Sequence, residues 1–217
     1  MRPGPKAVIF DMDEALLDRR RAWQYAIEES VAVVVGRRVS AAPLVDEYRM
    51  RPWSHALSII VDTPGERLRC EGLCAQMFER SGLKRLLVHE GTGVGLDILR
   101  GEMIEAGAIS REPHALAFKQ IHSTGLDRFI AVLAATPEAA AWNVAERIAQ
   151  CLAFLERSPA ETAFVSANAD DLAAAESAGS RPFEASWAAS EPTGYPAIER
   201  PGEVALQVVR AWRQRPS

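Results

Sequence analysis

Two aspartates separated by one residue follow the first apolar run of the chain. Residues 6–10, KAVIF, have the pattern of a buried parallel strand, and Asp11 and Asp13 come directly after it. A buried carboxylate costs several kcal/mol unless its charge is compensated, so a pair at one point indicates a use. The carboxylate of Asp11 could attack an electrophile and form a covalent aspartyl intermediate. Asp13 could act as a general acid for the leaving group and then as a general base for water.

Further polar residues lie at the ends of two later runs that we predict to be strands. Ser110 ends the run 103–110, and Asn168 and Asp171 lie at the end of the run 162–168. In a parallel sheet the carboxyl ends of the strands meet at one edge, which is where active sites lie. A serine hydroxyl and its neighbouring backbone amides could hold a phosphate or carboxylate oxygen. Acidic residues there could help to hold Mg²⁺, a hard cation that prefers oxygen ligands.

The order of the patterns predicts a parallel α/β sheet with a helical insertion. Helical periodicity dominates residues 18–88, whereas strands and helices alternate after this block. Alternation of this kind is typical of a sheet with helices on both faces. We therefore predict a core domain, residues 1–17 and 89–217, and an all-helical domain, residues 18–88. The expected helices are 18–36, 42–50, 53–61, 64–81, 95–103, 113–125, 138–157, 171–179 and 202–214, and the expected strands are 6–10, 103–110, 129–135, 162–168 and 181–187.

The ordered motifs resemble those of the haloacid dehalogenase (HAD) superfamily. Its phosphatases open with hhhhDxDG[TV]L, which VIFDMDEALLD matches here; AGAIS matches the second motif and FVSANADDLAAAESAG contains the fourth. The resemblance implies a Rossmann-like core and a cap domain that selects the substrate. It also implies that Asp11 is the nucleophile, Asp13 the general acid/base and Ser110 a phosphate-binding residue. Mg²⁺ would be held by Asp11, Asp13 and Asp171.

Three of the motifs depart from the phosphatase pattern. The usual Gly-Asp pair of the fourth motif is Ser166–Ala167, and Glu14 replaces the usual glycine of the first motif. The third motif is normally a lysine that neutralises the nucleophile and the substrate oxyanion. Counting back from Ser166 to its position reaches Trp142. The lysines of this chain are Lys6, Lys84 and Lys119.

A substitute for the missing lysine has to come from elsewhere in the chain. Lys119 lies in the helix expected after Ser110, and Arg147 and Arg157 are other candidates, although arginine is not equivalent to lysine. Removal of one such charge from a buried carboxylate cluster lowers a rate by roughly 10²–10³. The sequence is therefore compatible with a catalytically active site and with an inactive one.

Three functions follow from these residues. The leading hypothesis is a phosphatase that acts on a small phosphorylated metabolite through a phosphoaspartate at Asp11. The second is a catalytically degenerate HAD-fold binding protein. The third is a 2-haloacid dehalogenase-like hydrolase, because FVSAN followed by Asp171 resembles that metal-independent branch. Asn168 would bind the substrate there, or it could instead cap the next helix. That branch has an aromatic residue at the position of Asp13 and a threonine at that of Ala15.

The composition bounds the partners. The chain has 217 residues, 48% of them hydrophobic, and a net charge of −4, which argues against nucleic acid or an anionic membrane as a partner. No apolar stretch approaches the roughly 20 residues of a membrane span, and no targeting segment is recognisable. We expect a cytoplasmic protein with a small-molecule substrate.

A glycine-rich stretch, GTGVGL at residues 91–96, invites comparison with a dinucleotide-binding loop. It lacks the full G-x-G-x-x-G spacing after a strand. We therefore expect a flexible loop that leads back from the helical domain.

Overall fold

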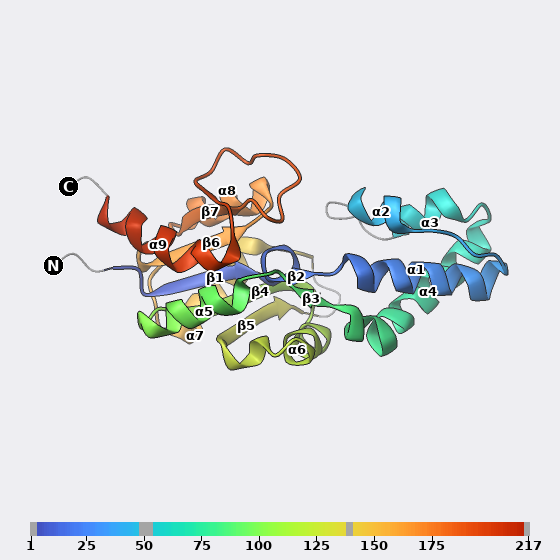
Figure 1. The fold of residues 1–217 in the computed structure, drawn as a ribbon, viewed down its shortest axis with the longest axis horizontal. Coiled ribbons are helices and arrows are strands. Elements are labelled where there is room, and N and C mark those ends of the chain that lie inside the picture. Colours follow the sequence, from blue (N-terminus) through green and yellow to red (C-terminus); the bar gives the residue numbers. More distant parts are fainter. Residues whose placement is uncertain (1–3, 48–53, 138–140, 215–217) are drawn as a thin grey trace. The chain divides into compact units, whose positions relative to one another are not determined.

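The computed structural model describes residues 4–47, 54–137 and 141–214 (Figure 1). By its internal contacts the chain divides into two compact units. One comprises Met1–Leu17 and Val88–Ser217, and the other comprises Asp18–Leu87.

The first unit is built on a six-stranded sheet with the order β5-β4-β1-β6-β7-β8. All five pairs of neighbouring strands are parallel, which confirms the predicted α/β class. The interior position of β1 explains why its sequence is apolar without alternation, since both of its faces are covered. The strands are β1 (Ala7–Asp11), β4 (Glu105–Pro113), β5 (Ile130–Thr136), β6 (Thr162–Ser166), β7 (Arg181–Ala185) and β8 (Ala197–Ile198).

Helices cover both faces of this sheet. Val8 and Phe10 of β1 belong to the hydrophobic cluster that includes residues of α5, α6 and α9. Ala7 and Ile9 belong to the opposite cluster, which includes residues of α7 and α8. Successive side chains of a strand point to opposite faces, so one short strand anchors both layers. The helices are α5 (Thr92–Gly101), α6 (His114–Ser123), α7 (Val144–Leu155), α8 (Ala169–Ser177) and α9 (Val204–Arg213).

The second unit is helical in its described part, apart from the ends of a short strand pair. Thr63 caps the start of the helix Pro64–Met77, because its hydroxyl accepts a hydrogen bond from the Glu66 amide and Pro64 occupies the first turn. The rings of Trp23 and Phe78 stack at 4.0 Å within this unit. Its helices are α1 (Arg20–Val35), α2 (Ala42–Glu47), α3 (Ser54–Ile60) and α4 (Pro64–Met77), and β2 (Leu17–Asp18) pairs with β3 (Leu87–Val88). Residues 48–53, at the ends of two expected helices, lie outside the described residues.

Two expectations about helix starts are wrong. The helix expected at 138–157 begins only at Val144, because the Asn143 side chain caps it by accepting a hydrogen bond from the Glu146 amide. The stretch 91–96, expected to be a loop, is the start of α5. Gly91 precedes this helix in the left-handed conformation, with φ of 87°.

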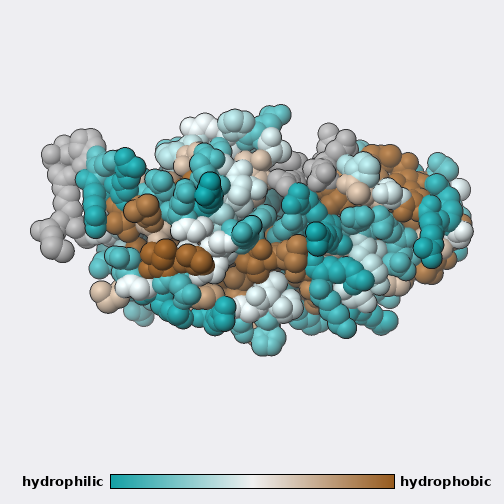
Figure 2. Space-filling view, in the orientation of Figure 1, coloured by the Kyte–Doolittle hydropathy of each residue, from teal (hydrophilic) through white to brown (hydrophobic). Residues whose placement is uncertain are grey.

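The face shown in Figure 2 is largely hydrophilic, with hydrophobic residues in small groups. Large apolar side chains that are exposed on α5 and α9 are Val94, Ile98 and Leu206. Within the described residues, no helix is long and apolar enough to cross a membrane.

We expect Gly95→Ala to destabilise the first unit. A Cβ atom at Gly95 would lie 2.3 Å from the carbonyl oxygen of Pro201, so the backbone of α5 or of the Pro201 turn would have to move. The expected loss in the free energy of unfolding is about 1–3 kcal/mol. Gly93→Ala is the matched control, because a Cβ there meets nothing within 4 Å. It should be neutral or stabilising by up to about 1 kcal/mol in urea unfolding. Equal effects of the two substitutions would contradict the packing argument.

Candidate active site

The nucleophile candidate Asp11 is the last residue of β1 and is fully buried. It precedes a π-helical turn, Met12–Leu16, and its Oδ1 accepts a hydrogen bond of 3.0 Å from the Asp13 amide. The turn is held from two sides. The Trp187 indole donates to the carbonyl oxygen of Ala15 at 3.1 Å, and the His89 ring donates from Nε2 to that of Glu14 at 2.9 Å.

Strand β4 orients the second aspartate. The hydroxyl of Ser110 donates to Oδ1 of Asp13 at 2.9 Å, and the amide of Arg111 donates to Oδ2 at 2.6 Å. The Ser110 oxygen in turn accepts a hydrogen bond from the Glu112 amide at 3.1 Å. The structure therefore brings together Asp11, Asp13 and Ser110, as the strand-end argument predicts, while their chemical roles remain predictions.

Ser166, at the end of β6, also contacts the nucleophile candidate. Its hydroxyl donates to Oδ2 of Asp11 at 3.2 Å and accepts from the Asn168 amide at 3.1 Å. The sequence indicated Ser166 only as a departure from the Gly-Asp pair, so this contact was missed. Its position at a strand end next to the fourth motif was the available signal.

The most informative residue that sequence reasoning missed is Arg111, which directly follows Ser110. Its guanidinium group forms an ion pair with the carboxylate of Asp171, and lies over the ring of Trp142 at 4.6 Å from the centroid. The Trp142 indole donates to Oδ1 of the same aspartate at 3.3 Å. Trp142, reached by counting back to the lysine position, thus lies in this cluster and contacts its cation.

The three cations that the sequence suggested in place of the third-motif lysine differ from Arg111 in their surroundings. Arg157 pairs with Glu105 at the beginning of β4, which is the opposite end of that strand from Ser110. Arg147 is buried and bonds to the Ala135 carbonyl oxygen and to Gln150. Lys119 is exposed on α6. Among the described residues, the positive charge that counteracts the raised pKa of Asp11 is that of Arg111.

A shift in strand register helps to place Arg111. Ser110 pairs with Ala135 and Pro113 with Thr136, so β4 contains extra residues relative to β5 at this point. Such irregularities redirect side chains relative to a regular strand. Because this register is a property of two strands together, the sequence around Arg111 does not reveal it.

Asn168 caps α8. Its Oδ1 accepts hydrogen bonds from the amides of Asp170 and Asp171, at 2.9 and 3.1 Å. This is the capping alternative that the sequence left open, and substrate binding by Asn168 remains a prediction. The cap fixes the first turn of the helix and so places the Asp171 carboxylate beside Arg111.

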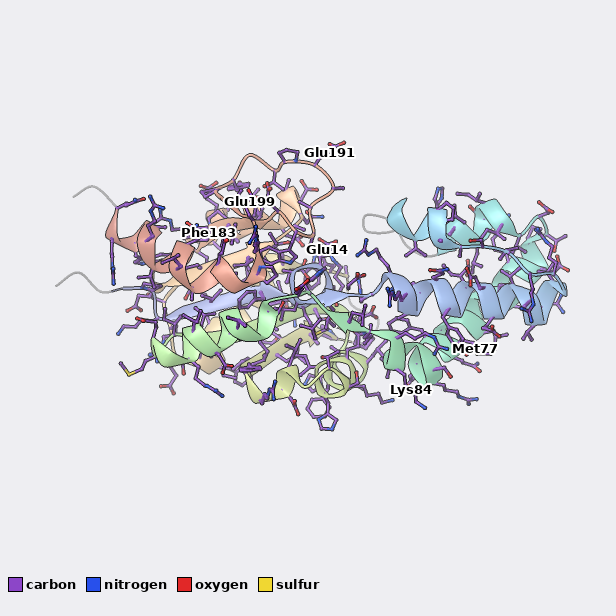
Figure 3. All side chains as sticks on the ribbon, viewed as in Figure 1. Glu14, Met77, Lys84, Phe183, Glu191 and Glu199 are labelled. Atoms are coloured by element: carbon purple, nitrogen blue, oxygen red, sulfur yellow. The ribbon has the colours of Figure 1, made fainter. Side chains whose placement is uncertain are left out.

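Burial dominates the electrostatics of the cluster. It raises the pKa of Asp11 well above its ordinary value, and the neighbouring charges of Glu14 and Asp13 raise it further, whereas Arg111 opposes them. Glu14, labelled in Figure 3, lies in the turn directly after β1. Burial likewise raises the pKa of Asp171, against the influence of Arg111. The pKa of Arg111 is lowered by burial but is raised overall by Asp11 and Asp171.

The three carboxylates predicted to hold Mg²⁺ do not fit that ion as they are arranged. Each of their six oxygens accepts a hydrogen bond from the protein, and one oxygen of Asp171 is paired with Arg111. The position of the usual second ligand is Ala167. In the part of the chain that the structure describes, no three His, Cys, Asp or Glu side chains are grouped to hold a metal ion. Metal ligation by Asp11, Asp13 and Asp171 therefore has no support in this geometry.

Comparisons with solved structures define the class of fold. No family model and no curated protein sequence matches the chain. A HAD-superfamily hydrolase of subfamily IA, variant 1, from Geobacter sulfurreducens is 19% identical, with 95% of this chain and 99% of that chain covered and a TM-score of 0.78. A proposed phosphatase from Clostridium difficile is 15% identical, with 95% and 100% covered and a TM-score of 0.82. A proposed phosphoglycolate phosphatase from Lactobacillus plantarum is 15% identical, with 94% and 99% covered and a TM-score of 0.73.

The protein has the fold of the HAD superfamily. These similarities extend over nearly the whole chain and confirm the resemblance found in the motifs. At such low identity they establish the fold, and the chemistry has to be argued from the residues.

We expect Asp11→Asn to stabilise the protein at neutral pH. The pKa of Asp11 is raised in the folded state above the value of about 3.9 for an unfolded chain. Stability is therefore lost as the pH rises from about 4 through the folded-state pKa, and the loss is complete above it. Each unit of elevation corresponds to about 1.4 kcal/mol, which the asparagine avoids.

Urea unfolding of the variant and the wild type over a range of pH measures this difference. The advantage of Asp11→Asn should disappear toward about pH 4 and should grow as the pH rises from there through the folded-state pKa of Asp11. Asp62→Asn, at an exposed position, is the control and should change stability by less than about 0.5 kcal/mol. If the variant is less stable than the wild type by the same amount at every pH, the ionised carboxylate of Asp11 does not lower the free energy of unfolding, and the prediction is wrong.

Proposed function

We propose that the protein is a hydrolase that removes the phosphoryl group from a small phosphorylated metabolite, with Asp11 as nucleophile. The observation that carries the proposal is the 2.9 Å bond between Ser110 and Asp13. It joins two motifs 97 residues apart and orients the acid/base candidate, whose backbone amide bonds to Oδ1 of the nucleophile candidate. Solved structures with this fold that are described as hydrolases and phosphatases support the reaction class.

The proposed reaction has two steps. In the first, a carboxylate oxygen of Asp11 attacks phosphorus, the bond to the leaving oxygen breaks, and Asp13 gives that oxygen a proton. In the second, water attacks the phosphoaspartate and gives its proton to Asp13, which releases orthophosphate and restores Asp11. The Ser110 hydroxyl, which bonds to Asp13 in this structure, would turn to a phosphoryl oxygen.

The remaining parts of the proposal rest on the resemblance and on composition. Residues 18–88 are proposed as a cap domain that selects the substrate. Mg²⁺ is the cofactor that the resemblance implies, and the poor fit described above argues against it. We propose a cytoplasmic location and no nucleic-acid or membrane partner.

A second candidate function is a binding module that has lost catalysis. It is favoured by one observation, which is that the protein itself already satisfies every oxygen of Asp11, Asp13 and Asp171. The hydrogen-bond network of such a site is complete without a substrate. The two candidates differ in whether any turnover depends on Asp11.

We expect orthophosphate release from at least one member of a panel of phosphorylated metabolites. Asp11→Asn should reduce it to background, because the amide is a poor nucleophile, and Asp13→Asn should lower kcat/KM by roughly 10²–10⁴. Asp97→Asn, at an exposed position on α5, is the matched control and should retain the wild-type rate.

Two other outcomes separate the alternatives. Absence of Asp11-dependent release over the whole panel, from variants with intact far-UV circular dichroism, would leave the binding module. Halide release from 2-chloropropionate that depends on Asp11 would instead support the dehalogenase-like hydrolase.

A further inference from the structure

We propose that Arg111 is the resident cation of this site and binds the phosphoryl group of the substrate without a divalent metal ion. This inference rests on the proposed function, since it names the group that recognises the same substrate. It goes further by assigning to one arginine the charge that the resemblance divides between a lysine and Mg²⁺.

Arg111 is held in a defined position. Its Nη2 pairs with the Asp171 carboxylate, and its Cζ lies over the ring of Trp142, 4.6 Å from the centroid. The Trp142 indole is itself bonded to Asp171, so the three side chains form a closed set of contacts. A guanidinium group fixed in this way loses little conformational freedom when it binds an anion.

Donors on Arg111 remain for a ligand. A guanidinium group carries five N–H donors, and among the described residues the acceptor contacted by this one is Asp171, through Nη2. The Arg111 side chain is 33% exposed, whereas Asp171 is 8% exposed and Asp11 is fully buried. The cation is therefore the accessible part of the cluster, and a paired fork of N–H groups matches the oxygens of a phosphoryl group.

The departures from the phosphatase pattern are explained together by this arrangement. Trp142, at the position reached for the lysine, supports Arg111 instead of supplying a charge. Ala167 removes a carboxylate that a divalent ion would need and that Arg111 does not. The backbone amide of Arg111 orients Asp13 while its side chain pairs with Asp171. Trp142 is on this view a positioning residue for Arg111.

The test measures anion binding separately from turnover. Asp11→Asn protein, which cannot form a phosphoaspartate, is treated with EDTA and titrated calorimetrically with inorganic phosphate. We expect saturable binding in EDTA and no gain in affinity when Mg²⁺ is added. In the same background, Arg111→Ala should weaken binding by roughly 10- to 100-fold, the effect of losing a charge-assisted hydrogen bond. Arg111→Lys, which keeps the charge without the fork, should lose less.

Matched variants exclude a general effect of charge or of folding. Arg128→Ala removes another exposed arginine that lies over an aromatic ring, that of Phe129, and should leave phosphate binding unchanged. Trp142→Phe keeps a ring beneath Arg111 but loses the bond to Asp171, and should weaken phosphate binding only a few-fold. Trp142→Ala should weaken phosphate binding nearly as much as Arg111→Ala does. If Arg111→Ala does not fold, the phosphate affinities of Arg111→Lys and Arg111→Gln are compared instead, and their ratio decides.

Phosphate binding that appears only with Mg²⁺, or that survives in a folded Arg111→Ala variant, would overturn the inference. Wild-type turnover that EDTA abolishes and Mg²⁺ restores would also overturn it while leaving the proposed hydrolase intact. Conversely, metal-free binding that depends on Arg111, without any turnover by the wild type, would retain the inference for an anion-binding site and reject catalysis.

Discussion

The buried charge of Asp11 is the constraint on which the site depends. A carboxylate at the end of an interior strand is removed from water, and its negative neighbours Glu14 and Asp13 add to the cost. A backbone amide and the Ser166 hydroxyl offset this cost by donating hydrogen bonds to Asp11, and Arg111 offsets it with its positive charge. The polar residues at the carboxyl edge of the sheet are thus understood as a network that makes one unfavourable charge tolerable.

A stable protein does not require such a charge, since an apolar residue at this strand end would cost less. Its presence, within a fold shared with HAD-superfamily hydrolases, is the reason to treat the network as a site. The same network explains why motif spacing alone was ambiguous. Its positive member does not lie where the superfamily pattern places the lysine, but one strand away, beside Ser110.

The sheet and the meeting of Asp13 with Ser110 could be predicted from the sequence, because both follow from local patterns. A continuous apolar run indicates a strand with both faces covered, and the carboxyl ends of parallel strands share one edge. The late start of α7 was less accessible, since the apolar periodicity continues upstream of the cap at Asn143. The role of Arg111 was not accessible, because it depends on a register shift between two strands and on Trp142 from a distant segment.

Arg111 contributes to the site through two chemically separate groups. Its amide, which belongs to the backbone, holds Asp13, and its side chain holds Asp171. Nearly any residue at position 111 would still offer the first contact, and proline alone would remove it. A substitution at position 111 therefore leaves this bond to Asp13 in place, whereas it changes the charge of the site. In evolutionary terms, a single codon could retune which anion this cluster accepts without disturbing the acid/base candidate beside it.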